Sequence, residues 1–351
     1  MQDSKIELTF KMKRKFKLLI INSLVFVGML VLLEVSFQLI KPYKLYQRTY
    51  PAQIRDKTFK DKQIKVNWMK IDSSVGWVCS NSNNLKFSNI FYNQFDIKYN
   101  INKQGYRSNF DFCDENFPNK KKMMLLGDSF LFGWYLEYPH TLAGQLEFLD
   151  NDFQFFNFGI PGYGIDQMFM TFRKYYEQIN PEVIVLIYID DDIPRILESY
   201  RFFEGLNKPS YKINSKGFEY RYSTDYNFII TLLHHSYIMN KFYEKYLDYL
   251  AVSFTKKMIK QIKIESQKEL LVVRWPRTEM LSWRKIDWYY DLSEFCNSNG
   301  IHYVNLADYF SGLPVDQIQS FYLTHDGHPS AVGNKFVAEL LCKEIKKIIN
   351  K

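Results

Sequence analysis

The segment Lys121–Phe130, KKMMLLGDSF, decides the fold of this chain. Its apolar run Met123–Leu126 has the length of a buried β-strand, and Gly127 ends it. A helical stretch follows at His140–Leu149. Because a strand that leads into a helix is half of a βαβ unit, this segment predicts a parallel sheet with crossover helices.

Four further apolar runs are predicted as strands of the same sheet. The run Glu182–Ile189, EVIVLIYI, is nearly uninterrupted and rich in β-branched residues, as in a strand buried on both faces. A last helix begins near Pro329. The expected fold class is therefore α/β, a three-layer α/β/α domain with a five-stranded parallel sheet. The other three runs are Phe153–Asn157, Glu269–Arg274 and His302–Asn305.

Two segments fall outside this alternation of strands and helices. Residues 41–118 are rich in Tyr, Asn, Lys and Ser and include the alternating stretch Asp96–Asn102, so they are predicted to form a β-rich and loop-rich pre-domain. Residues 119–351 form the α/β domain in this division of the chain. Between its third and fourth strands, residues 195–265 are a Tyr- and Phe-rich insertion with the length to form a lid.

Polar or glycine-rich motifs follow the first three strands. Ser129 in Gly127-Asp128-Ser129 stands at the start of a helix, which suits a nucleophile, although the triplet also fits a turn with a helix cap. The second strand ends in a loop with three glycines, whose N–H groups can approach a ligand closely. The third ends in Asp190–Asp192, and three adjacent carboxylates there are more typical of a site than of a solvated turn.

A fourth motif, Thr324–Ser330 (THDGHPS), opens the last helix. Its His328 has the chemistry to act as general base to Ser129. In this order and at strand ends, the four motifs resemble those of the SGNH (GDSL-type) hydrolase family over roughly residues 121–345. The segment Ile101–Arg107, INKQGYR, resembles the N-x-x-G-[FY]-R segment of bacterial membrane-anchored members.

This resemblance implies a flavodoxin-like SGNH fold and a set of site residues. Ser129 would be the nucleophile and His328 the general base, and the N–H groups of Ser129 and Gly162 would bind the oxyanion. The resemblance also implies an acid that orients the histidine, and it implies that no metal or organic cofactor takes part.

The chain departs from the family pattern at two positions. Where the family has an oxyanion-hole Asn, this chain has Asp191, or Asp190 if the motif slips by one residue. An ionised Asp has no proton to donate, so Asp191 contributes only when protonated, or the hole works with backbone donors alone. The acid that usually stands three residues before the catalytic histidine is replaced by His325. We expect Asp326 to orient His328 instead, with a Ser–His dyad as the alternative.

The N-terminal region is expected to anchor the protein in a membrane. Residues 18–40 are apolar apart from Glu34, and as a helix they span about 34 Å, enough for a hydrocarbon core of about 30 Å. A buried core helix is the alternative, and a cleaved signal peptide is not expected because the apolar segment is too long. Residues 1–17 carry more Lys and Arg than the residues just after Ile40, so the positive-inside rule puts residues 1–17 in the cytoplasm. The expectation is a single-pass protein of the inner (cytoplasmic) membrane with a periplasmic or extracellular C-terminal domain.

Composition excludes several classes of protein. The chain of 351 residues is 46% hydrophobic and 24% charged, which excludes wholesale disorder and a multi-span transporter. The formal net charge is +8, but several of the positive residues lie in the first 17, so a nucleic-acid partner is not expected. The four cysteines do not have the spacing of a metal site. A disulfide between Cys79 and Cys113 is possible in an oxidising compartment, and the sequence does not decide it. Cys296 and Cys342 are expected to be buried thiols on helices.

These expectations combine into a membrane-anchored, extracytoplasmic serine esterase that forms an acyl-enzyme on Ser129. Its substrate would carry an ester, for example an acylated glycan or lipid. Two alternatives remain: an O-acyltransferase that modifies an exported or cell-surface polysaccharide, and a non-catalytic protein that retains the SGNH fold.

Overall fold

The structure, a computed structural model, describes residues 2–40, 68–80, 82–89, 94–113, 117, 119–197, 200–201, 206–207, 210–214, 217–221, 237–277, 290–324 and 326–350. The chain divides into two compact units. One consists of Met1–Tyr50 and Asp225–Tyr246, and the other of Pro51–Thr224 and Leu247–Lys351. Each unit is described by itself.

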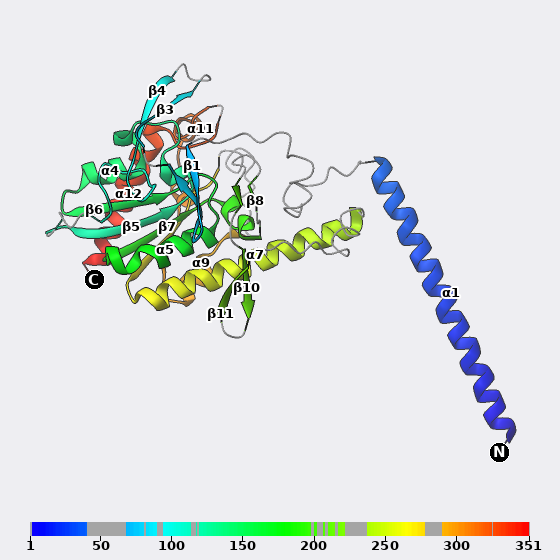
Figure 1. The fold of residues 1–351 in the computed structure, drawn as a ribbon. Helices are drawn as coiled ribbons and strands as arrows, with labels where there is room; N and C mark the ends of the chain where they lie inside the picture. Colours follow the sequence, from blue (N-terminus) through cyan, green and yellow to red (C-terminus); the bar gives the residue numbers. More distant parts are fainter. Residues whose placement is uncertain are drawn as a thin grey trace. The chain divides into compact units, whose positions relative to one another are not determined.

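Five parallel strands form the central sheet of the larger unit (Figure 1). Their order across the sheet is β13-β12-β7-β5-β6, and every neighbouring pair is parallel. This confirms the predicted five-stranded parallel sheet. In chain order the arrangement is 2-1-3-4-5, the flavodoxin-like order, whose switch point between β5 and β7 is where such sheets bind ligands. The strands are β5 (Lys121–Gly127), β6 (Phe153–Gly159), β7 (Val183–Tyr188), β12 (Glu269–Arg274) and β13 (His302–Asn305).

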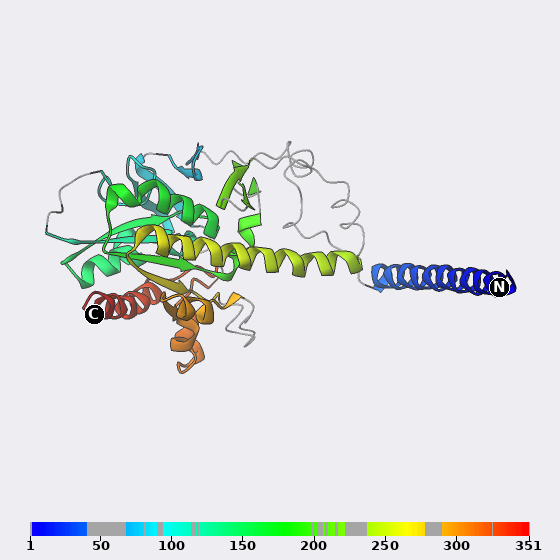
Figure 2. The ribbon, with the colours of Figure 1, turned by 90° about the horizontal axis from the view of Figure 1, so that it is seen from below.

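Helices cover both faces of this sheet and complete the three layers. In Figure 2, α12 lies on the opposite side of the sheet from α5. The helices of this unit are α3 (Ser129–Phe132), α4 (Leu142–Leu149), α5 (Ile165–Ile179), α9 (Ser293–Ser298), α10 (Leu306–Phe310), α11 (Val315–Ser320) and α12 (Ala331–Ile349), with short 3₁₀ turns η4 (Tyr138–His140), η5 (Asp190–Asp192) and η6 (Pro194–Leu197). A further helix, α7 (Tyr237–Ser266), begins in the smaller unit and ends in this one.

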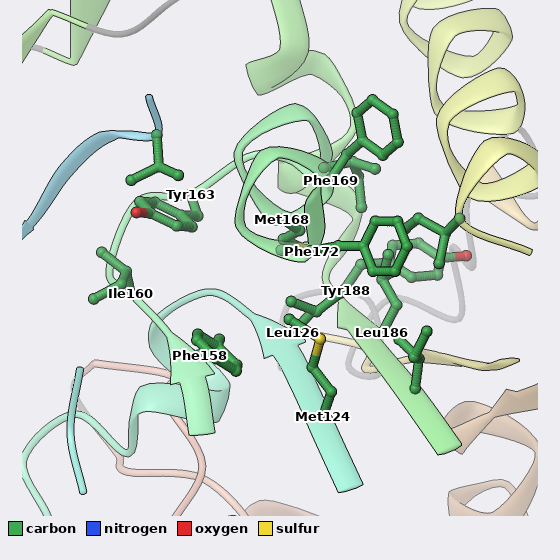
Figure 3. Close-up of a cluster of buried hydrophobic side chains, with 14 of the residues drawn as sticks. Met124, Leu126, Phe158, Ile160, Tyr163, Met168, Phe169, Phe172, Leu186 and Tyr188 are labelled. Carbon is green, nitrogen blue, oxygen red and sulfur yellow. The ribbon is translucent and has the colours of Figure 1, made fainter. Parts of the chain in front are cut away.

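Successive residues of the central strands point to opposite faces, and each face has its own buried cluster. Met124 of β5 packs in the cluster that contains α5, whereas Met123 packs in the cluster that contains α4 and α12. Figure 3 shows Met124 and Leu186 on the side of the sheet covered by Phe172 of α5. Burying one large apolar side chain contributes about 1.5–3 kcal/mol. The helix forms here because its apolar residues recur at helical spacing, at Ile165, Met168, Phe169, Phe172, Tyr175 and Ile179.

The segment before β5 forms two antiparallel pairs, β1 (Met69–Asp72) with β2 (Gly76–Cys79) and β3 (Ser82–Asn89) with β4 (Gln94–Ile101). Trp77 of β2 and Tyr99 of β4 are fully buried in the same cluster as Met124 of the central sheet. The described residues on either side of residue 118 therefore share one core, and the domain boundary placed there stays a prediction.

Much of the predicted insertion lies outside the described residues, including 222–236. Its described strands pair as β8 (Tyr200–Arg201) with β9 (Leu206–Asn207), and β10 (Ser210–Asn214) with β11 (Gly217–Arg221). The C-terminal half of α7 brings Ala251, Met258 and Ile259 into the core. This half is thus the crossover between β7 and β12, while the lid stays a prediction.

The smaller unit contains α1 (Gln2–Ile40). The stretch Lys13–Ser36 is a helix of 24 residues that is long and apolar enough to cross a membrane, and among the described residues none of its most apolar part is buried. The helix also continues back through the basic residues before Leu18.

All four cysteines are free thiols. Cys79 is buried and Cys113 is exposed, so the disulfide left open by the sequence is not formed. Cys296 on α9 and Cys342 on α12 are buried, as expected.

Candidate active site

Ser129 lies in a sharp turn at the end of β5. The carboxylate of Asp128 caps the following helix by accepting the N–H of Phe130 at 2.9 Å. The cap is therefore Asp128 and not Ser129, whose hydroxyl lies 3.3 Å from the other oxygen of the same carboxylate. Helix α3 is a single turn that ends at Gly133, whose φ of 79° is left-handed. So short a helix has little macrodipole, and individual N–H groups must stabilise charge at Ser129.

The structure brings together the three residues predicted to form the catalytic triad. The Nε2 atom of His328 lies 2.8 Å from the Ser129 Oγ. Its Nδ1 atom lies 2.6 Å from the Asp326 Oδ2. One ring nitrogen therefore contacts the hydroxyl and the other contacts an acid, which is the arrangement that lets a histidine accept a serine proton.

A left-handed glycine explains how an acid only two residues before His328 reaches its ring. Gly327 has a φ of 74°, and its N–H and that of Asp326 both donate to the Leu323 carbonyl. The N–H of Leu323 donates in turn to the His328 carbonyl at 2.8 Å. This tight loop folds the Asp326 side chain back toward the imidazole. His325, the residue at the usual acid position, lies outside the described residues.

Two backbone N–H groups are available beside the nucleophile. Ser129 and Gly162 both line the same cavity. Among the described residues, neither N–H donates to another protein group. Gly162 has a φ of 80°, which a residue with a side chain rarely adopts. These are the two N–H groups expected to bind the oxyanion.

Close packing of β6 against α3 brings the glycine-rich loop next to Ser129. A Cβ atom at Gly159 would lie 2.5 Å from the Phe132 nitrogen, so only glycine fits there. Asn157 fixes the same junction, because its side chain accepts the Gly159 N–H and donates to the Leu131 carbonyl. Asn157 is thus a structural link between strand and turn.

The segment Ile101–Arg107 contacts the nucleophile turn through its last residue, Arg107. The buried guanidinium of Arg107 donates to the carbonyls of Phe132, Gly133 and Leu136. It also lies over the Tyr99 ring, 4.1 Å from the centroid. The arginine of this motif therefore holds the chain that leaves α3.

Each carboxylate of Asp190–Asp192 pairs with its own arginine. Asp190 receives two hydrogen bonds from Arg274, at 2.7 and 2.6 Å. Asp191 pairs with Arg277, and Asp192 with Arg195. Each of the three adjacent acids therefore has a guanidinium partner.

The structure pairs Asp191 with Arg277, a partner that the sequence analysis does not anticipate. Asp191 is not among the residues that line the cavity with Ser129 and Gly162, and its Oδ2 pairs with Arg277. A carboxylate that binds a guanidinium is ionised and has no proton to donate. Arg277, which the sequence analysis did not single out, lines the cavity instead. The signal for Arg277 was its position just beyond the carboxyl end of β12.

Arg195 connects the acids to the nucleophile turn. Its Nη1 atom contacts Asp192 and lies 3.2 Å from the Asp128 Oδ2. It also donates to the Tyr163 carbonyl at 3.1 Å. Burial, together with the nearby charge of Asp128, raises the pKa of Asp192 well above its usual range, while Arg195 acts in the opposite direction. One guanidinium therefore joins the ends of β5, β6 and β7.

The cavity above Ser129 has a volume of about 670 Å³. Its lining combines aromatic and charged side chains, and the rings of Trp68 and Trp134 stand 5.4 Å apart between centroids. The remaining described lining residues are Met69, Phe130, Pro161, Ile189, Arg195, Asp326, Gly327 and His328. The cavity is thus large enough for an acyl ester and opens directly onto the Ser–His pair.

Comparison with known proteins gives structural neighbours only. No protein-family model and no curated protein match the chain. The lipase/acylhydrolase from Enterococcus faecalis is 14% identical, covers 65% of this chain and 96% of its own, and has a TM-score of 0.42. A member of the lipolytic protein G-D-S-L family from Veillonella parvula is 12% identical, covers 64% of this chain and 97% of its own, and has a TM-score of 0.40. The psychrotrophic esterase EstA from Pseudoalteromonas is 12% identical, covers 66% of this chain and 100% of its own, and has a TM-score of 0.39.

The chain's own features agree with the resemblance found in its sequence. The sheet has the flavodoxin-like order, Ser129 follows its first strand, and His328 precedes its last helix. The chain has the fold of the SGNH (GDSL-type) hydrolases, and its Ser129 and His328 side chains meet at 2.8 Å.

Proposed function

We propose that this protein is a serine esterase that acts on an acyl ester through an acyl-enzyme on Ser129. The observation that carries the proposal is the 2.8 Å contact between the Ser129 Oγ and the His328 Nε2. The Asp326 carboxylate on the other ring nitrogen supports it, because it fixes the tautomer whose Nε2 accepts a proton.

In the first half-reaction the Ser129 Oγ attacks the ester carbonyl while His328 takes the hydroxyl proton. The carbonyl oxygen becomes an oxyanion that accepts hydrogen bonds from the N–H groups of Ser129 and Gly162. Collapse of the intermediate breaks the bond to the alkoxide, which leaves with the proton from His328. Asp326 stabilises the imidazolium between these two proton transfers.

In the second half-reaction a water molecule gives a proton to His328 and attacks the acyl carbonyl. The bond between the acyl carbon and the Ser129 Oγ then breaks, His328 returns the proton to Oγ, and the carboxylic acid leaves. The same step with a sugar hydroxyl in place of water would make the protein an O-acyltransferase. Hydrolysis and acyl transfer share the first half-reaction, so the proposed function requires only that an acyl-enzyme forms on Ser129. Product analysis with and without an added glycan separates hydrolysis from transfer.

We further propose that α1 anchors the enzyme in the cytoplasmic membrane with its catalytic unit outside. The apolar stretch Lys13–Ser36 and the excess of basic residues before it support this topology. A tag at Lys351 should then be digested by protease added to intact spheroplasts. Protection of that tag would contradict the orientation.

Labelling with a fluorophosphonate tests the nucleophile. The full-length protein in detergent should react covalently at Ser129 and should hydrolyse a short-chain aryl ester. Ser129→Ala should lose both activities, while Ser298→Ala, on the surface of α9, should keep both. If wild type is neither labelled nor active, the non-catalytic alternative gains support, and equal labelling of Ser129→Ala would place the nucleophile elsewhere.

A further inference from the structure

The β1–β2 hairpin, which lies outside the four motifs, contacts the glycine-rich loop at the oxyanion site. Trp77 of β2 is fully buried, and its indole N–H donates to the Pro161 carbonyl at 3.2 Å. That carbonyl belongs to the same peptide group as the Gly162 N–H. The hairpin therefore holds one end of the peptide whose other end is an expected oxyanion donor.

The orientation of this peptide follows from its planarity. In a trans peptide the carbonyl and the N–H point in opposite directions, and the described residues contain no cis peptide. With the Pro161 oxygen directed at Trp77, the Gly162 N–H must point away from the hairpin. Trp77 does not line the cavity above Ser129, whereas Pro161 and Gly162 do.

The loop here is a β-turn with two accessible orientations of its central peptide. The Tyr163 N–H donates to the Ile160 carbonyl at 3.3 Å, and the φ of 80° at Gly162 is that of a type II turn. Proline at the second position suits both type I and type II turns, and glycine adopts φ of either sign. A type I turn would rotate the central peptide and turn the Gly162 N–H away from its present direction.

Further contacts fix the hairpin against this loop and the helix that follows. The Tyr163 hydroxyl donates to the Trp77 carbonyl at 2.6 Å, and the two rings meet edge to face. Gln167 donates to the Val75 carbonyl at 2.8 Å. Figure 3 shows Tyr163 in the loop that leads from β6 into α5, on the same side of the sheet as Met168.

We propose that Trp77 is a positioning residue that selects the type II orientation of the Pro161–Gly162 peptide and so completes the oxyanion hole. The inference rests on the proposed esterase activity. It assigns to the pre-domain a role in catalysis, since this hairpin would determine whether one of the two N–H donors faces the substrate.

Trp77→Phe tests the proposal, because it keeps an aromatic ring and removes the N–H donor. We expect kcat for a short-chain aryl ester to fall about tenfold with KM within about twofold, since the lost interaction forms only in the transition state. The inhibition constant of an arylboronic acid, whose tetrahedral adduct on Ser129 puts an oxygen in the hole, should rise about tenfold. Unchanged kcat and boronate affinity would overturn the proposal.

Two further variants separate positioning from folding. Asp72→Asn removes an ion pair between the same hairpin and α5 without touching Pro161, so kcat should stay within about twofold. Gly162→Ala disfavours the positive φ and should reproduce the loss of kcat. Adding Trp77→Phe to Gly162→Ala should then cost little more, because both changes affect the same peptide. Additive losses would contradict a shared cause.

A crystal structure of Trp77→Phe would show the orientation of the Pro161–Gly162 peptide directly, without an activity measurement. We expect a negative φ at Gly162 in all or part of the molecules, and a fully retained type II turn would refute the inference. If the wild type is inactive and unlabelled at Ser129, the proposed function fails on its own. If the wild type is active while the variant keeps its turn and its kcat, only the inference about Trp77 fails.

Discussion

Asp326 and His328 are separated by one glycine, and their side chains meet at 2.6 Å between Oδ2 and Nδ1. The left-handed Gly327 makes this spacing workable. The Asp326 side chain is 29% exposed and the His328 side chain 19% exposed. The contact therefore lies where a charge-assisted hydrogen bond can hold the ring in one orientation.

Asp326→Asn should lower kcat about 10²-fold or more, because an amide neither stabilises the imidazolium nor fixes the required tautomer. Asp316→Asn, on the exposed helix α11, is the matched control and should leave kcat unchanged. The measurement is aryl ester turnover at saturating substrate. A fall of less than about threefold would favour the Ser–His dyad.

The Asp191–Arg277 pair gives a second prediction. Since Asp191 pairs with the Arg277 guanidinium and is not among the residues that line the cavity, Asp191→Asn should not raise the rate selectively at neutral and alkaline pH. Asp191→Asn and Arg277→Gln should have similar effects, and the double variant should be no worse than either. pH–rate profiles of the three variants provide the measurement. A gain confined to neutral and alkaline pH would instead indicate that a protonated Asp191 donates to the oxyanion.

Arg107 gives a prediction about stability. Its guanidinium donates to three carbonyls at the exit of α3, which an ammonium group on a flexible stem cannot match. Arg107→Lys leaves buried carbonyls unpaired and should lower the free energy of unfolding by about 2–3 kcal/mol. Arg173→Lys alters an exposed ion pair with Glu265 and should cost less than about 1 kcal/mol. Denaturant unfolding compares the two variants, and equal small losses would mean that Arg107 does not support the turn.

The sheet and the Ser–His pair could be predicted because their signals are local. A buried strand is a continuous apolar run, and in a parallel sheet the residues after such runs gather at one edge. Ser129, Gly162 and His328 all follow from that rule together with the family resemblance. Asp326 could be proposed from the sequence only because a carboxylate stands near His328. Whether its side chain contacts the imidazole depends on the φ of Gly327, which the sequence does not reveal.

Other contacts depend on tertiary register that the sequence does not reveal. Arg277 meets Asp191 because β12 pairs with β7 so that Arg274 lies beside Tyr188. Trp77 meets Pro161 across 84 residues, with no periodic pattern to connect them. The expectation for Asp191 did not anticipate its partner for this reason. A single acid can be recognised in the sequence, but its counter-ion Arg277 comes from the segment that follows another strand, β12.

Asp72 links the hairpin to the α/β core. Its Oδ1 accepts the N–H of Ser74 at 2.9 Å, and its Oδ2 pairs with Lys174 of α5 at 2.6 Å. Burial of the carboxyl favours a higher pKa, but the hydrogen bonds from Lys174 and Ser74 outweigh it and lower the pKa to about 2. The native protein therefore binds this proton more weakly than the unfolded chain does.

This difference predicts how Asp72→Asn changes with pH. A carboxyl with a lowered native pKa stabilises the fold above its unfolded pKa of about 4, and this contribution is lost as the pH falls through about 2. At pH 7 the variant should be about 1 kcal/mol less stable than wild type, a figure reduced for solvent screening of a partly exposed pair. The difference should shrink below pH 4 and vanish below pH 2. Asp111→Asn, which removes a more exposed pair with Lys103, is the control and should show a smaller difference throughout. A gap between Asp72→Asn and wild type that stays constant from pH 7 to pH 2 would show that hydrogen-bond geometry, and not the charge of Asp72, holds the hairpin against α5.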